Sequence, residues 1–145
     1  MFNKVLVVND NDILLFTAKK MLTKANCTKE IETAINGQIA IDYLQLLTEQ
    51  TPDAFPDLII LDLHMPIVDG WEFMEQYDAL FANAFPQTKI VILSASINPE
   101  DMEQIQQYAF VLGDIINGIN LSIIENIQQR YRQSIAVANN QHMVA

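Results

Sequence analysis

A chain of 145 residues, half of them hydrophobic, is long enough for one domain with a substantial core and too short for two. Its 18 acidic residues outnumber its 8 lysines and arginines, and a net charge of −10 argues against direct nucleic-acid binding because phosphates would repel it. One cysteine, Cys27, excludes an internal disulfide, and nothing indicates export or membrane insertion, so we expect a cytoplasmic protein with protein partners.

The first predicted strand is the Val-rich run 4–8, which ends on the polar residues 9–12. An amphipathic helical pattern follows, in which apolar residues recur at helical spacing. They are Leu14, Ala18, Met21 and Leu22. Asp12 precedes this helix, and we interpret it as the N-cap, with a contribution to a metal site as the lesser alternative.

A weaker strand at 30–34 alternates charged and apolar residues, which is typical of a sheet edge. Asn36-Gly37 then turns the chain. Ala40, Leu44 and Leu47 give the next helix a buried face, and residues 48–56, with two prolines, form a loop.

The run 58–61 is apolar without alternation, as in a parallel strand covered on both faces, and it ends on Asp62. Asp62 alone has an alternative interpretation as a cap or turn residue. Asp10, however, follows the first strand in the same way. If both strands are central and parallel, the two carboxylates converge at one rim, where they repel each other unless a cation lies between them. Oxygen ligands of this kind suit Mg²⁺, and the backbone carbonyl of His64, in the loop beside Asp62, is a third expected ligand.

Apolar residues at helical spacing follow Gly70, and we interpret them as core rather than as a ligand site. They are Trp71, Met74, Tyr77, Leu80 and Phe81. A fourth strand at 89–93 ends on Ser94. The segment 98–101 has the features of a helix start, and the thin apolar face of that helix, formed by Met102, Ile105 and Ala109, predicts that it is loosely held.

We assign the fifth strand to 113–116 and the last helix to a pattern of Leu121, Ile124, Ile127 or Gln128, and Tyr131. Alternating strands and helices predict an α/β fold, a doubly wound (βα)5 flavodoxin-like parallel sheet with strand order 2-1-3-4-5. The expected domain is 1–132, and 133–145 lacks periodicity and is expected to be a frayed tail.

From Lys4 to about Tyr131 the chain resembles the receiver domain of bacterial two-component response regulators. The resemblance rests on Val-Val-Asn-Asp closing the first strand, Leu-Asp-Leu-His-Met-Pro with Asp-Gly closing the third, and Ile-Leu-Ser-Ala closing the fourth. It implies that Asp62 accepts a phosphoryl group from a phosphohistidine, that Asp10 holds Mg²⁺, and that Ser94 bonds the phosphoryl oxygen. It also implies a sensor histidine kinase or histidine phosphotransfer protein as the donor.

The chain departs from the family pattern in its pocket. Receivers usually close the fifth strand with Lys-Pro, and one register puts Asn117 and Gly118 there, without a cis peptide. An alternative register puts Gly113 and Asp114 there. The first register, which we prefer, puts Asp114 at the place of the aromatic residue that couples phosphorylation to the fourth and fifth strands, with Phe110 nearby. Asn9 replaces the first acid, which leaves Asp10 and Asp62 as the expected carboxylates.

Three functions remain open. The leading hypothesis is a stand-alone receiver switch, not an enzyme, that signals to a downstream protein through its fourth helix, fifth strand and fifth helix. The same face is a candidate for homodimer formation. The missing lysine and Asn9 favour the second hypothesis, a receiver-like interaction module that works without phosphorylation. The third is a Mg²⁺-dependent aspartyl-phosphate hydrolase, which is weakened because His64 stands where its second Asp would be.

Overall fold

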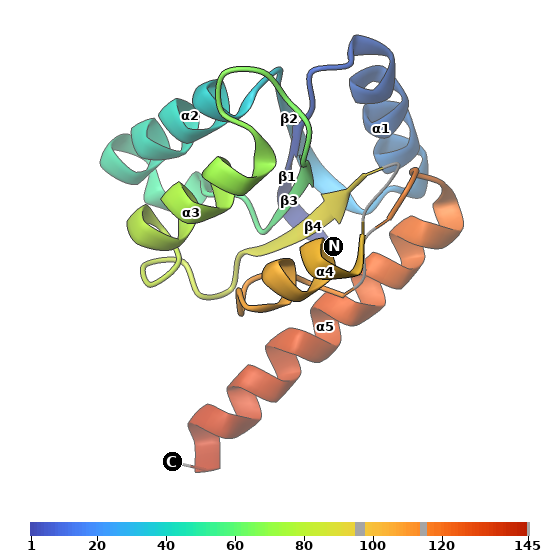
Figure 1. Ribbon diagram of the computed structural model, residues 1–145. Coiled ribbons are helices and arrows are strands. Elements are labelled where there is room, and N and C mark those ends of the chain that lie inside the picture. Colours follow the sequence, from blue (N-terminus) through green and yellow to red (C-terminus); the bar gives the residue numbers. More distant parts are fainter. Residues whose placement is uncertain (95–97, 114–115, 145) are drawn as a thin grey trace.

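The computed structural model describes residues 1–94, 98–113 and 116–144. It is an alternation of strands and helices (Figure 1). The elements, in chain order, are β1 (Phe2–Val8), α1 (Asp12–Ala25), β2 (Thr28–Ala34), α2 (Gly37–Gln50), the short 3-10 helix η1 (Pro52–Ala54), β3 (Leu58–Asp62), α3 (Gly70–Leu80), β4 (Lys89–Leu93), α4 (Pro99–Gln106) and α5 (Leu121–Val144).

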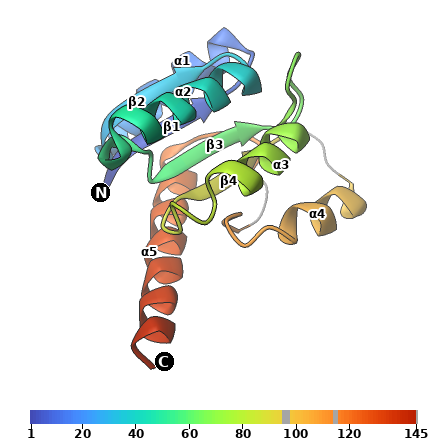
Figure 2. The same cartoon turned by 90° about the vertical axis from the view of Figure 1, so that its left-hand side faces the viewer.

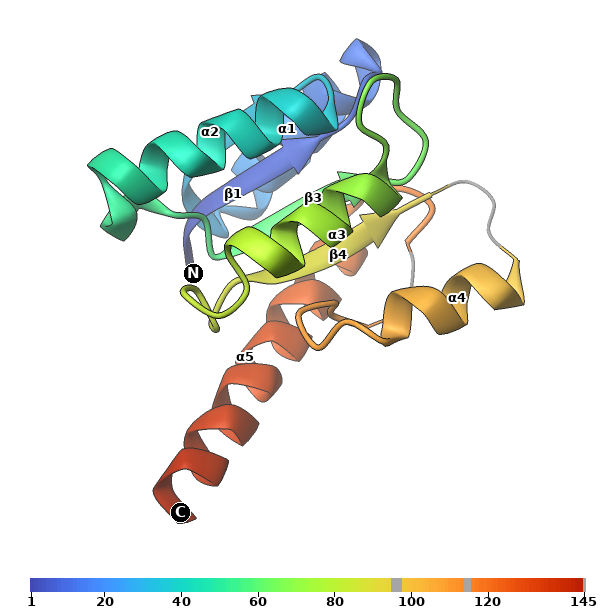
Figure 3. The same ribbon diagram turned by 60° about the vertical axis from the view of Figure 1, so that its left-hand side comes forward.

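The strands form a parallel sheet in the order β2-β1-β3-β4. This confirms the doubly wound flavodoxin-like fold class and the interpretation of β2 as an edge strand. The first four residues of β3 are buried, because β1 and β4 flank it and helices cover both faces. The arrowheads of β1, β3 and β4 point to one end of the sheet, where the loop between β3 and α3 and the start of α1 also lie (Figure 3).

The predicted fifth strand is not formed by the residues that the structure describes. Val111 pairs with Ile90, and Ile116 pairs with Leu93, as isolated parallel bridges. Val111 and Ile116 are five positions apart whereas Ile90 and Leu93 are three apart, so the two bridges do not belong to one regular ladder. Asp114, at the place of the family's aromatic residue, lies outside the described residues.

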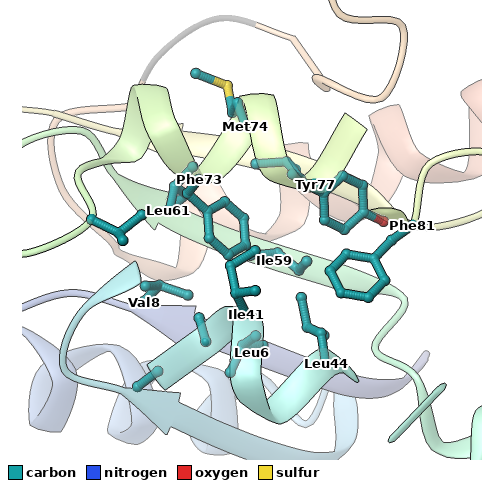
Figure 4. Packing of buried hydrophobic residues seen from close by; sticks show 14 of the residues in the cluster. Leu6, Val8, Ile41, Leu44, Ile59, Leu61, Phe73, Met74, Tyr77 and Phe81 are labelled. Atoms are coloured by element: carbon teal, nitrogen blue, oxygen red, sulfur yellow. The ribbon is translucent and has the colours of Figure 1, made fainter. Parts of the chain in front are cut away.

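Two hydrophobic layers hold the sheet. The helices α2 and α3 cover one face and α1 and α5 the other, and α5 continues past the sheet (Figures 1 and 2). On the first face, Phe73 and Tyr77 of α3 and Phe81, directly after it, form one cluster with Leu6 and Ile59 (Figure 4). Met74 is also buried but points to the other side of α3 in that view. The interpretation of the apolar pattern after Gly70 as core holds for three of its five members, since Trp71 is half-buried and Leu80 is exposed.

The N-cap of α1 is Asn11, so the assignment of Asp12 was wrong. The Asn11 side chain accepts hydrogen bonds from the backbone N–H groups of Ile13 and Leu14, at 3.0 and 3.2 Å. Asp12 is the first helical residue, where a carboxylate still stabilises the positive end of the helix.

The fourth helix has the predicted start, because the Asn98 side chain accepts from the backbone N–H of Asp101 at 2.9 Å. Ile105 is its only buried residue, as the thin apolar face predicts. Ala109 was wrongly included in that face, since the helix ends at Gln106 and Ala109 is exposed.

The last helix continues to Val144 and so runs through 133–144, which the sequence suggests is a tail. The boundary of the domain at 132 stays a prediction. Among the described residues, no helix combines the length and the apolar character needed to cross a membrane.

Candidate functional site

The sheet register brings Asp62 and Asp10 to the same rim. Asp62 is the last residue of β3 and pairs with Leu93 of β4. On its other side, Leu61 pairs with Val8, the last residue of β1, and Asp10 follows two positions later. The first and third strands are therefore neighbours that end at the same level, which is the arrangement that the sequence predicts.

The environment of Asp62 disfavours its charged form. Burial raises the pKa of Asp62 above its usual value, and the charge on Asp10 raises it further. The backbone N–H of His64 opposes this by donating a hydrogen bond to Asp62 Oδ1 at 3.2 Å. A half-buried carboxylate held next to a second one has a destabilised negative charge, which a bound cation would relieve.

An open depression of about 340 Å³ lies at this rim. Its lining comes from Asp10 and from the loop after β3, which contributes Leu63, His64, Met65, Pro66 and Asp69. Asp69 is a third carboxylate that our sequence analysis missed, although its place before Gly70 as a helix N-cap was visible. Its Oδ1 accepts from the Glu72 backbone N–H at 2.9 Å, so one oxygen is already committed to the helix.

Asn9 is buried and turned into the loop between β1 and α1. Its side-chain oxygen accepts a hydrogen bond from the backbone N–H of Asn11 at 2.9 Å, and its own N–H donates to the Ala34 carbonyl at 3.0 Å. The residue that replaces the family's first acid thus holds the loop that carries Asp10.

Ser94 and Asn117 each come directly after one residue of a bridged pair, because Leu93 of β4 pairs with Ile116. Ser94 is buried and comes directly after β4, and its backbone N–H donates to the Ile116 carbonyl at 2.8 Å. Asn117, the next residue, is exposed. The pairing of Ile116 with Leu93 puts Asn117 at the end of its segment, whereas Gly113 precedes that pairing. Asn117 therefore directly follows the residue that bonds Ser94, and its place at the usual lysine position stays a prediction.

The close approach of α3 to β3 requires glycine at position 70. A Cβ atom there would lie 2.6 Å from both the Asp62 carbonyl oxygen and the Leu63 Cα, which are backbone atoms. We therefore expect Gly70→Ala to lower the free energy of unfolding by about 1 to 3 kcal/mol, as overpacking does. Urea denaturation checks this. Gly118→Ala is the control, because a Cβ at Gly118 meets nothing within 4 Å. Equal stability of both variants would contradict the close approach.

The residues at the rim fit a magnesium ion. Asp10 and Asp62 are the two carboxylates, and the His64 carbonyl the backbone oxygen, that would hold such an ion. Among the described residues no three His, Cys, Asp or Glu side chains form a metal centre. Two carboxylates are enough for Mg²⁺, which keeps several of its waters and accepts a backbone oxygen. The side chain of His64 itself is exposed.

Comparisons with known proteins identify relatives of this chain. A family model described as the response regulator receiver domain matches residues 5–111. The sensory/regulatory protein RpfC of Xanthomonas campestris pv. campestris is 25% identical over 137 residues, which cover 90% of this chain and 17% of that protein. The protein PilG of Pseudomonas aeruginosa is 33% identical over 94 residues, which cover 63% of this chain and 60% of PilG. The chain thus spans less than two thirds of these relatives.

Solved structures share the fold. A two-component response regulator from Cytophaga hutchinsonii matches with a TM-score of 0.82 at 22% identity, covering 91% of this chain and 98% of that one. The chemotaxis protein CheY4 of Vibrio cholerae matches with a TM-score of 0.70 at 25% identity, covering 90% and 99%. The receiver domain of the histidine kinase CKI1 from Arabidopsis thaliana, complexed with Mg²⁺ and BeF3⁻, has a TM-score of 0.72 at 22% identity and covers 90% of each chain.

Proposed function

Because this chain belongs to the response regulator receiver family, we propose that it accepts a phosphoryl group on Asp62 and works as a switch in a two-component phosphorelay. The observation that carries the proposal is the half-buried carboxylate of Asp62 at the end of a central strand, where Asp10 and the loop that follows Asp62 line an open depression.

The transfer is a nucleophilic displacement at phosphorus. A carboxylate oxygen of Asp62 attacks the phosphorus of a phosphohistidine, the O–P bond forms, the P–N bond breaks, and the imidazole leaves with a proton. The product is an acyl phosphate. The hydroxyl of Ser94, directly after the neighbouring strand β4, donates a hydrogen bond to a phosphoryl oxygen. The side-chain amide of Asn117 offers an uncharged hydrogen-bond donor.

Asp10, Asp62 and the His64 carbonyl would hold Mg²⁺, which when bound neutralises charge on the phosphoryl oxygens and orients the group for in-line transfer. The role of Asp10 is therefore to bind the cation. Asn9 stabilises the loop that carries Asp10, through the hydrogen bond that it accepts from the Asn11 N–H.

Receiver domains take phosphoryl groups from histidine kinases or phosphotransfer proteins and pass the signal to a downstream protein. For this chain we propose a cytoplasmic switch whose output face is α4, the predicted fifth strand and α5. The weak attachment of α4, which buries only Ile105, supports movement there, and the same face is our candidate for homodimer formation. Catalysis of a separate reaction is not part of the proposal.

A second function has its own support. Asn9 is already hydrogen-bonded within the loop, and Asn117 brings no charge, so the site has less with which to hold a doubly negative phosphoryl group. A receiver that binds its partner without phosphorylation would tolerate both residues.

Incubation with acetyl phosphate and Mg²⁺, followed by intact-mass measurement, separates the two functions. The phosphoacceptor gains the mass of one phosphoryl group, and chelation of the metal by EDTA prevents the gain. An unchanged mass under both conditions supports the phosphorylation-independent module instead.

Restoring the missing charge at position 117 should strengthen the switch. A charge-assisted hydrogen bond contributes about 1.5 to 3 kcal/mol, against about 0.5 to 1.5 for a neutral one. We therefore expect Asn117→Lys to lower the dissociation constant for beryllofluoride, measured with Mg²⁺ present, by about tenfold. Asn126→Lys is the matched control, because it makes the same replacement at an exposed position of α5. An equal change in both variants, or none in Asn117→Lys, would contradict a role for this position.

A further inference from the structure

Ile67, in the loop between β3 and α3, has a backbone conformation that isoleucine avoids. Its φ is 70°, in the left-handed region, where the β-branched side chain crowds the backbone. The other non-glycine residue with positive φ in the described part of the chain is Asn26, which caps the C-terminus of α1 and suits that place. Glycine or asparagine would adopt the Ile67 conformation at lower cost.

Neighbouring contacts fix the loop on both sides of Ile67. The backbone N–H of Gly37 donates to the Val68 carbonyl at 3.2 Å, and the N–H of Gly70 donates to the Leu63 carbonyl at 3.0 Å. Val68 is buried, whereas the Ile67 side chain is 74% exposed. Within this chain, the isoleucine at position 67 therefore adds strain without a corresponding gain in burial.

Two more exposed isoleucines lie next to this loop. Ile35 and Ile39, which are 52% and 43% exposed, flank Gly37, and a Cβ at Gly37 would lie 2.5 Å from the Val68 carbonyl oxygen. The start of α2 thus packs against the loop. Ile35, Ile39 and Ile67 form what we call the isoleucine patch, beside the depression that Pro66 and Asp69 line. Residues 33–41 and 65–68 contain no charged side chain, so the patch suits an apolar surface rather than a charged one.

We propose that the isoleucine patch docks the protein that carries the phosphohistidine, with Ile67 inserted into an apolar site on that protein. The inference rests on the proposed function and names the contact that selects the donor. A phosphohistidine that reaches Asp62 brings its own protein over this rim, so the surface next to the depression is covered during transfer. Burial of Ile67 in the complex then accounts for an exposed, strained isoleucine at this place.

A small phosphodonor enters the depression without docking, and this gives a selective test. Asparagine tolerates positive φ, so Ile67→Asn keeps the loop and removes the apolar contact. We expect this variant to lower kcat/KM for phosphorylation by a protein donor about tenfold, mainly through a higher KM, and to leave the rate with phosphoramidate unchanged. Leu80→Asn is the control, because Leu80 is 48% exposed at the far end of α3 and should leave both rates unchanged.

The protein donor is chosen from a panel of purified histidine kinases and phosphotransfer domains that carry radioactive phosphate. The member that phosphorylates the wild type fastest is used. A melting temperature of Ile67→Asn at or above that of the wild type verifies the fold. The docking role would be overturned if Ile67→Asn leaves kcat/KM with the protein donor unchanged, or if it lowers the rate with phosphoramidate equally. It would also be overturned if phosphoramidate phosphorylates the wild type but no member of the panel does. Failure of phosphoramidate to phosphorylate the wild type would instead overturn the proposed function, and the docking role with it.

Discussion

Asp62→Asn is expected to abolish phosphorylation by acetyl phosphate, because the amide lacks the nucleophilic oxygen that forms the acyl phosphate. Intact-mass measurement would show the gain of one phosphoryl group in the wild type and no gain in the variant. The replacement conserves shape and leaves the half-buried position at the end of β3 filled, so the loss would report on the reaction rather than on the fold.

Asp69→Asn is the matched control for this experiment. Like Asp62→Asn it removes one negative charge, here from the lining of the depression. Asparagine caps a helix as well as aspartate does, so the hydrogen bond from the Glu72 N–H is kept. Phosphorylation should persist in Asp69→Asn. If both variants lose it, negative charge in the depression and not the Asp62 nucleophile limits the reaction. Persistence in Asp62→Asn would move the phosphoacceptor elsewhere.

Asp10→Ala is expected to abolish Mg²⁺ binding, since it leaves Asp62 as the one carboxylate assigned to the ion. Isothermal titration calorimetry with MgCl2 would show no heat of binding over the range that saturates the wild type. Mg²⁺-dependent phosphorylation should be lost with it.

The neighbouring acid supplies the control for that titration. Asp12→Ala also removes one negative charge from the start of α1 but leaves the cap at Asn11 intact. Its affinity for Mg²⁺ should stay within about twofold of the wild type, because exposed charges that are not ligands are strongly screened. Equal losses in both variants would mean that general electrostatics, and not ligation by Asp10, set the affinity.

The sequence was sufficient to predict the central strands and the convergence of Asp10 with Asp62. Unalternating apolar runs that end on polar residues have few alternative interpretations, and parallel pairing then requires their carboxyl ends to share a rim. The edge strand β2 was equally readable from its alternation of charged and apolar side chains, because most residues of this strand are exposed.

Features that depend on the local backbone path were not predictable in this way. Asn11 and Asp12 are both good caps, and only the geometry shows which side chain meets the free N–H groups. In the segment after α4, the two bridging residues Val111 and Ile116 are five positions apart, whereas their partners in β4 are three apart. The periodicity of the sequence does not reveal such an irregular pairing. The positive φ of Ile67 contradicts residue preference, so tertiary contacts had to impose it.

Direct mapping of the phosphorylated residue is the sharpest test of the account. Borohydride reduces an aspartyl phosphate to homoserine, and tandem mass spectrometry of the digested protein locates the modified position. After treatment with acetyl phosphate and Mg²⁺, we expect homoserine at position 62 and at no other aspartate. Homoserine at Asp10 or Asp69, or a protein without any reducible phosphate, would contradict it.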